Sequence, residues 1–269
     1  MAAVYTLSDL LRVMQRLRDP DGGCPWDLQQ TFESIVPSTL EECYELAATI
    51  EQGDYPHMAE ELGDVLFQVV FYAQMATEQK LFSFEDVVDT LVDKLVRRHP
   101  HVFADGKIEG RVSKTSSVSD VKDSWESIKA KERSEKNLPG LLDDVPVALP
   151  ALPRAQKLQK RAARVGFDWA SFDGVIAKLR EELTELQNEL ERNDTERAAE
   201  ELGDLMFSCV NLARHLGEDA EHVLRRANSK FERRFRAMES SANSGEQALA
   251  NLDSEQLDEL WREAKRQDL

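Results

Sequence analysis

The sequence is poor in cysteine and contains no long apolar run. Among its 269 residues only Cys24, Cys43 and Cys209 are cysteines, and no two of them form a C-x-x-C pair. An odd number without this pair indicates neither a disulfide framework nor a thiolate zinc site, and it favours a reducing, cytoplasmic environment. No apolar segment approaches the roughly 20 residues that a membrane-spanning helix needs.

Positive charge is also scarce. The chain has 34 lysines and arginines against 51 acidic residues, a formal net charge of -17. This excess opposes non-specific binding to nucleic acid or to an anionic membrane, and we expect neither as a partner. If the ligand is itself an anion, a cation must mediate its binding. The 41% of hydrophobic residues is enough for the cores of one large or two ordinary domains.

Alternating strand patterns are absent as well, and the apolar residues recur at helical spacing. Leu183, Leu186 and Leu190 are three and four residues apart, which places them on one face of a helix. The N-terminus lacks a basic start followed by an apolar core, so it predicts an amphipathic helix capped by Ser8 or Asp9 and not a secretion signal. The sequence therefore predicts an all-α protein.

The chain repeats itself. The six letters AEELGD occur at residues 59–64 and, 140 residues later, at 199–204. At the same offset EECYEL at 41–46 meets EELTEL at 181–186, and at an offset of 136 the patterns K-x-x-R-R and W-x-x-x-K also recur. Such agreement over most of the chain indicates two tandem domains. We assign residues 1–135 to the first domain, 136–153 to a proline-rich linker and 154–269 to the second.

The repeated words place carboxylates in pairs. On a helix Glu182 and Glu185 share one face, as do Glu201 and Asp204. The short turn predicted at Asn193 can bring the two pairs together, where four carboxylates would repel one another unless a cation lay between them. All-oxygen ligation favours Mg²⁺, with Mn²⁺ as the alternative.

A solvated acidic face is the plainer interpretation, since such spacings are common on exposed helices. The duplication argues against it, because a solvated face need not retain Gly63 and Gly203, each of which costs about 1 kcal/mol relative to alanine inside a helix. A glycine here indicates close approach of a helix or of a ligand, and we favour packing by a helix.

With E-E-x-x-E, E-E-L-G-D, K-x-x-R-R and W-x-x-x-K in order, and GCPWD near the start, the sequence resembles the MazG family. The resemblance covers nearly the whole chain. It implies two tandem MazG-type helical domains whose helices pack as four-helix bundles in a homodimer. It also implies Mg²⁺-dependent hydrolysis of NTPs and dNTPs to the nucleoside monophosphate and pyrophosphate.

The same resemblance implies roles for individual residues. The metal would be held by Glu182, Glu185, Glu201 and Asp204, and Glu182 and Asp204 would also lie against the substrate. We add Glu181 as the catalytic base, because it lies one turn from Glu185. Further nucleotide contacts are implied for Lys178, Glu181, Arg197, Glu200, Lys230, Arg233, Arg234 and Trp261, to which we add Lys265.

Some of these assignments agree with the residues themselves. Lys230 and Arg234 are four apart on one helix face, which suits a polyphosphate clamp, and the ring of Trp261 offers a base a stacking surface. The plainer alternatives are a surface ion-pair partner for each cation and a core position for the tryptophan.

The two halves differ at the predicted cations. Ser38 stands where the second half has Lys178, and His57 stands where it has Arg197. Pro37 predicts that the first acidic helix begins near that residue. We therefore expect the second half to be the main catalytic domain, with a second, weaker metal site in the first half at Glu42, Glu45, Glu61 and Asp64.

Other functions remain compatible with the sequence. One is a nucleotide sensor or partner-binding module that holds metal without turnover, and another is a purely structural helical scaffold. A third keeps the chemistry but changes the substrate to a modified nucleotide or an alarmone.

Overall fold

A computed structural model describes residues 4–111, 117–135, 140–244 and 248–268. Those residues form α-helices and short 3-10 turns without any strand, so the all-α prediction is confirmed. The chain divides into two compact units, Met1–Lys129 and Ala130–Leu269. No helix within the described ranges is both long and apolar enough to cross a membrane. The predicted limits at 135 and 153 stay predictions, and residues 136–139 of the linker lie outside the described residues.

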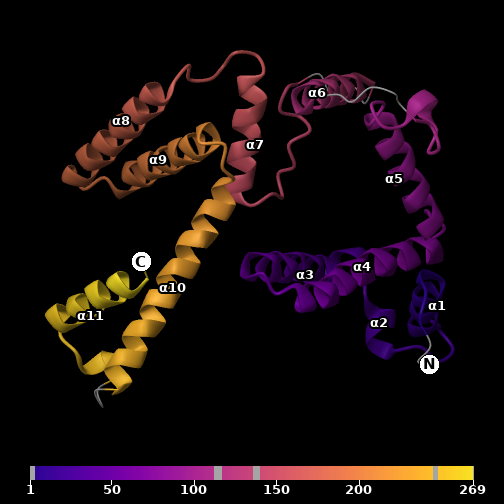
Figure 1. The fold of residues 1–269 in the computed structure, drawn as a ribbon, viewed down its shortest axis with the longest axis horizontal. Coiled ribbons are helices and arrows are strands. Elements are labelled where there is room, and N and C mark those ends of the chain that lie inside the picture. Colours follow the sequence, from indigo (N-terminus) through magenta and orange to yellow (C-terminus); the bar gives the residue numbers. More distant parts are fainter. Residues whose placement is uncertain (1–3, 112–116, 136–139, 245–247, 269) are drawn as a thin grey trace. The chain divides into compact units, whose positions relative to one another are not determined.

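The first unit is built on a helical hairpin, drawn in indigo and purple in Figure 1. Helices α3 and α4 lie side by side, α5 continues from the end of α4, and α6 meets the far end of α5 (Figure 1). The helices that begin in this unit are α1 (Leu7–Leu17), α2 (Pro25–Gln29), α3 (Phe32–Gln52), α4 (Tyr55–Glu78), α5 (Phe84–Arg98) and α6 (Val118–Glu135), with a 3-10 turn η1 (Ala104–Gly106) before α6. Helix α6 continues past the boundary of the unit at Lys129.

The turn between α3 and α4 follows directly from its residues. Gly53 ends α3 with φ 70°, a left-handed conformation that glycine adopts without steric cost. Asp54 then caps α4, accepting a hydrogen bond from the backbone N–H of His57. Two adjacent residues thus reverse the chain and hold the acidic faces of the helices next to each other.

The core of the first unit joins α1, α3 and α4. Met14 of α1, Ile35 of α3 and Phe71 of α4 are buried in one cluster with Val70 and Met75. The packing of α1 is reinforced by Arg18, whose guanidinium lies 2.7 Å from a carboxylate oxygen of Glu78. The core lies at the end of the hairpin that is remote from the acidic words, so those carboxylates are left near its turn.

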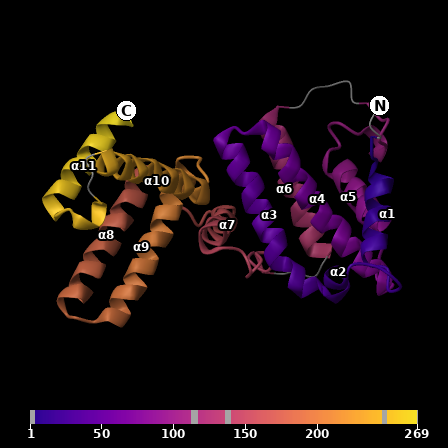
Figure 2. The same cartoon turned by 90° about the horizontal axis from the view of Figure 1, so that it is seen from below.

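The second unit contains a matching hairpin. Helices α8 and α9 lie antiparallel, as Figures 1 and 2 both show, and Asn193 at φ 57° followed by the helix cap Asp194 makes the predicted turn. The helices of this unit are α7 (Ala151–Ala163), α8 (Phe172–Glu191), α9 (Thr195–His215), α10 (Ala220–Ser244) and α11 (Ser254–Gln267), with a 3-10 turn η2 (Leu249–Asn251) before α11.

Helix α7 is attached to α9 through glutamine side chains. Gln159 donates to the backbone oxygen of Phe207 at 2.8 Å, and Gln156 donates to the backbone oxygen of Glu218 at 3.0 Å. Gln156 also accepts from the N–H of Ala220 at 2.9 Å, which satisfies a donor at the start of α10. Both buried glutamines donate an amide N–H to a backbone oxygen, whereas Oε1 of Gln159 accepts no hydrogen bond from the described residues.

Two local predictions are corrected by the structure. The first helix is capped by Thr6, which forms a capping box with Asp9, and not by Ser8 or Asp9. Helix α3 begins at Phe32, because Thr31 caps it, so Pro37 lies inside the helix. In the second unit, helix α7 begins at Ala151, with Pro153 in its first turn, where no helical hydrogen bond needs the proline nitrogen.

Candidate metal and nucleotide site

The acidic residues of α8 and α9 converge on Glu182. Oxygen atoms of Glu182, Glu201 and Asp204 lie within 4.8 Å of one another, and so do oxygen atoms of Glu181, Glu182 and Glu185. Glu182 belongs to both groups, and its side chain is only 4% exposed. The structure therefore brings the other three predicted metal ligands, together with Glu181, around the buried carboxylate of Glu182.

The electrostatics of the cluster show crowded negative charge. Burial, and then the charges of Glu185 and Glu182, raise the pKa of Glu201 above its usual value. The only ammonium paired with these groups in the described ranges belongs to Lys178, which lies 2.6 Å from Glu182 and 2.7 Å from Glu181. One positive charge does not balance five carboxylates.

The donor set fits a hard divalent cation. Every candidate ligand atom is a carboxylate oxygen, the donor that Mg²⁺ and Mn²⁺ prefer. The ammonium of Lys178 already rests on Glu182, which shows that this carboxylate is placed to receive a cation. The residues that would hold the metal are Glu182, Glu185, Glu201 and Asp204.

The other predicted residues of the hairpin lie nearby on the same helices. Lys178 and Glu181 pair with each other on α8. Arg197 is in the first turn of α9, and Glu200 lies one turn further on. Arg197 and Glu200 are both exposed.

The predicted residues of α10 and α11 form a separate group. The guanidinium of Arg234 lies 6.0 Å from the ring centre of Trp261, whose ring also contacts that of Phe231 at 5.4 Å. Lys230 and Lys265 are exposed on these helices. No hydrogen bond or ion pair between described residues joins this group to the carboxylates around Glu182.

Asp268 is a member of this second group that the sequence analysis missed. Its carboxylate accepts from Arg233 at 3.1 Å and from Arg234 at 2.9 Å. The hydrogen bond from Arg233, and next that from Arg234, lower the pKa of Asp268. No motif marks this residue, because the contact joins positions more than thirty residues apart. Asp268 thus forms ion pairs with both arginines that the sequence predicts as nucleotide contacts.

The first half keeps the carboxylates without the lysine. Oxygen atoms of Glu42, Glu45 and Glu61 lie within 4.8 Å of one another, and Asp64 is outside this group. Burial raises the pKa of Glu42, and the charge of Asp64 raises it further, ahead of those of Glu45 and Glu61. The weaker metal site predicted in the first half is thus assembled in part. Three of its four carboxylates form one cluster, and the charge of the fourth, Asp64, raises the pKa of Glu42.

His57 does not replace the missing cation. Its Nδ1 lies 2.9 Å from Asp54 and its Nε2 lies 3.8 Å from Glu60. The hydrogen bond to Asp54 is the main cause that raises the pKa of this histidine. The imidazole is therefore engaged by the helix cap and not by the candidate ligands.

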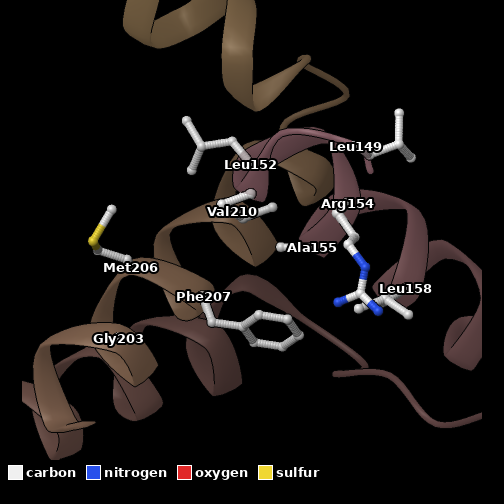
Figure 3. Close-up of a pocket in the computed structure, with 10 residues that line it drawn as sticks. Leu149, Leu152, Arg154, Ala155, Leu158, Gly203, Met206, Phe207 and Val210 are labelled. Carbon is white, nitrogen blue, oxygen red and sulfur yellow. The ribbon is translucent and has the colours of Figure 1, made fainter. Parts of the chain in front are cut away.

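The two repeated glycines are not packing sites within the chain. A methyl group at Gly63 or Gly203 would meet no heavy atom within 4 Å outside the backbone of its own helix. Gly203 instead borders an apolar cavity of about 480 Å³ between α7 and α9 (Figure 3). The expectation of a helix packed on these glycines is wrong for the described residues of one chain.

A profile of the MazG nucleotide pyrophosphohydrolase domain matches the chain twice, over residues 30–103 and 170–238. The chain belongs to the MazG family. Each match contains one acidic hairpin, so the resemblance and the tandem arrangement are both confirmed, and the prediction of a nucleotide pyrophosphohydrolase is confirmed at the level of the family.

Curated relatives agree with this assignment. A protein of Escherichia coli K12 named nucleoside triphosphate pyrophosphohydrolase is 50% identical over 262 residues, which is 97% of this chain and 97% of that protein. A Thermotoga maritima relative, named nucleoside triphosphate pyrophosphohydrolase/pyrophosphatase MazG, is 45% identical over 96% of this chain and 94% of its own. A Mycobacterium tuberculosis protein, also named nucleoside triphosphate pyrophosphohydrolase, is 38% identical over a region that covers 60% of this chain and 46% of that protein.

Proposed function

We propose that this MazG protein hydrolyses NTPs and dNTPs to the nucleoside monophosphate and pyrophosphate, with Mg²⁺ as cofactor. The observation that carries the proposal is the convergence of four carboxylates on the buried Glu182 within the second MazG domain. The names of the E. coli and T. maritima relatives support the substrate class and the reaction.

The chemistry follows from the residues of the hairpin. Glu182, Glu185, Glu201 and Asp204 would hold the divalent cation, which would supply positive charge to offset the charge that develops on the pyrophosphate leaving group. Glu181 is exposed and not needed as a ligand, so it would take the proton of the attacking water. Lys178 and Arg197 would bind phosphate oxygens from the two helices of the hairpin, and Glu200 would lie against the nucleotide.

The group on α10 and α11 would bind the remainder of the nucleotide. Lys230, Arg233 and Arg234 would engage the polyphosphate once it displaces Asp268, and Lys265 would add a further charge. Trp261 is only half-buried, so part of its ring is available for a base to stack upon.

We also propose a homodimer in which the hairpins form four-helix bundles. The face of α8 and α9 exposes large apolar side chains, among them Leu190 at 56%, Leu202 at 47% and Met206 at 50%. Apolar side chains at helical spacing on an exposed hairpin favour burial against a second hairpin. The three free thiols support the cytoplasmic location expected from the sequence.

A product-resolved assay across natural and modified NTPs tests the reaction. Monophosphate with pyrophosphate is expected, whereas diphosphate with phosphate would overturn the reaction type. Nucleotide binding without any product would favour the sensor, and a nucleotide affinity that does not respond to Mg²⁺ would favour the scaffold. A strong preference for a modified nucleotide or an alarmone would keep the chemistry and change the substrate.

A paired substitution tests which half is catalytic. Replacing Glu201 and Asp204 by alanine removes two carboxylates of the second half, and we expect kcat/KM to fall by about a hundredfold or more. Replacing Glu61 and Asp64 by alanine is the matched control and should leave most of the activity. The reverse result would assign catalysis to the first half.

A further inference from the structure

The ammonium of Lys178 lies where the two carboxylate groups of the second half overlap. Its Nζ is 2.6 Å from Oε1 of Glu182 and 2.7 Å from Oε1 of Glu181. Glu182 is the buried carboxylate that both candidate ligand groups share. A cation that belongs to the chain therefore already contacts the central ligand of the site.

This ammonium and a divalent cation would compete. They need the same carboxylate of Glu182, and two cations side by side repel each other in a partly dry site. A divalent cation on Glu182 therefore requires the ammonium of Lys178 to move away from this carboxylate. One third of its side chain is exposed, and its flexible stem allows this movement.

The first half lacks this competition. The position that matches Lys178 is Ser38, which has no charge. Within the described residues no lysine or arginine forms an ion pair with Glu42, Glu45 or Glu61. The two halves therefore present similar carboxylates to a metal, but only the second presents them with a cation already attached.

We propose that Lys178 is an exchangeable cation, which holds Glu182 before metal arrives and transfers to a substrate phosphate once a divalent cation takes the carboxylates. This inference rests on the proposed function for the identity of the phosphate. It makes metal and nucleotide bind cooperatively in the second half, since each favours the position of Lys178 that the other needs. The first half binds metal without regard to nucleotide.

Binding of Mn²⁺ alone tests the exchange without using turnover. The full chain carrying Glu42→Gln and Glu61→Gln, which disable the first half, is titrated with Mn²⁺, and free Mn²⁺ is measured by electron paramagnetic resonance. Adding Lys178→Met should tighten Mn²⁺ binding about tenfold in the absence of nucleotide. In the parent, an α,β-methylene dNTP analogue should increase Mn²⁺ affinity. The fold-increase in the Lys178→Met variant should be about ten times smaller than in the parent.

Two further variants separate exchange from damage to the fold. Lys178→Arg keeps the charge and should keep the weak Mn²⁺ binding of the parent. The reverse change is made in the first half, in a chain whose second site is disabled by Glu182→Gln and Glu201→Gln. In that chain Ser38→Lys adds an ammonium beside the first-half carboxylates and should weaken Mn²⁺ binding there about tenfold. The circular dichroism at 222 nm of every variant should match that of the parent.

The outcomes are distinct. Mn²⁺ affinity that stays the same or falls in Lys178→Met overturns the exchange, and if that variant does not fold, unchanged affinity in Ser38→Lys overturns it. If the variants show the expected Mn²⁺ effects but the wild-type chain releases no pyrophosphate from NTPs, the proposed function is overturned. The competition for Glu182 then still stands.

Discussion

Glu182 is ionisable and yet buried, which requires nearby compensation. Removing a carboxylate from water is costly unless it is paired or hydrogen-bonded. Lys178 supplies one partner, and the surrounding carboxylates make the need for a second cation greater. Burial also restricts the side chain of Glu182 before any metal binds. Folding therefore already provides part of the side-chain ordering that metal binding requires.

Asp168 shows how a single carboxylate can organise the start of the hairpin. It accepts hydrogen bonds from the guanidinium of Arg214, from the ring of His215 at 3.2 Å and from the backbone N–H of Trp169 at 2.9 Å. The segment before α8 is thereby tied to the last turn of α9. The hydrogen bond from Arg214 is the largest cause that lowers the pKa of Asp168.

We expect Asp168→Asn to lower the free energy of unfolding by about 1–2 kcal/mol at pH 7, because it removes a partly buried ion pair. A folded-state pKa below the usual value of about 3.9 means that this stability is present above that pH. It is lost as the pH falls through the folded-state pKa.

Urea titrations of both proteins at pH 7 and pH 3 measure this effect. The difference between wild type and variant should shrink at the lower pH. Glu191→Gln, at an exposed position in the same unit, is the control and should change stability by less than about 0.5 kcal/mol at either pH. A difference that persists unchanged at pH 3 would assign the effect to packing and not to the charge of Asp168.

At the scale of elements, two glycines with different backbone conformations can be compared. Gly203 lies inside α9, and a methyl group added there would meet no heavy atom within 4 Å outside the backbone of its own helix. Gly53 ends α3 in the left-handed conformation, at φ 70°. The first position tolerates a side chain and the second does not. The two glycines therefore provide opposite controls for one substitution.

We expect Gly203→Ala to raise the free energy of unfolding by about 0.5–1 kcal/mol, because alanine is the better helix former. Gly53→Ala should lower it by about 1–2 kcal/mol, because alanine is strained in the left-handed conformation. Thermal unfolding followed by circular dichroism measures both. A loss of stability in Gly203→Ala would indicate that the helix of a second protomer or a ligand fills the space beside α9.

The helix pair α10 and α11 carries its predicted nucleotide residues as a preassembled set. Arg234 and Trp261 are already in contact, and Asp268 holds the two arginines. An anion arriving there has to displace a carboxylate, which favours a strongly charged ligand such as a polyphosphate over a weakly charged one. The set thus supports the proposed substrate class independently of the carboxylates of the hairpin.

At the scale of the whole molecule, the exposed apolar face of α8 and α9 leads to a prediction about assembly. Light scattering after gel filtration should give the wild-type chain twice its mass of 30.6 kDa. Leu202→Glu combined with Met206→Glu places charge in the proposed interface, and we expect it to reduce the dimer to monomer. A wild-type mass of 30.6 kDa would overturn the homodimer.

Asn188→Glu is the matched control for charge, because Asn188 is also exposed on α8 but belongs to a polar part of its surface. It should leave the mass of the dimer unchanged. If the double variant also stays dimeric, the interface lies elsewhere on the chain and the apolar face of the hairpin needs another explanation.

Much of the architecture could be predicted because it depends on local periodicity. The spacing of Leu183, Leu186 and Leu190 predicts a helix in any environment, and the repeated AEELGD predicts a second domain like the first. The errors at the helix starts were also local. Thr31 begins α3 five residues earlier than Pro37 suggested, since a good cap outweighs one lost hydrogen bond.

The sequence alone determined that the chain is helical, that it is duplicated, and that each half carries paired carboxylates. Only the tertiary structure decided that Glu182 is the buried member and that Asp268 holds Arg233 and Arg234. The reason is physical. Helical periodicity is set by neighbours along the chain, whereas burial and ion pairing depend on which helix faces meet, and residues far apart in sequence decide that.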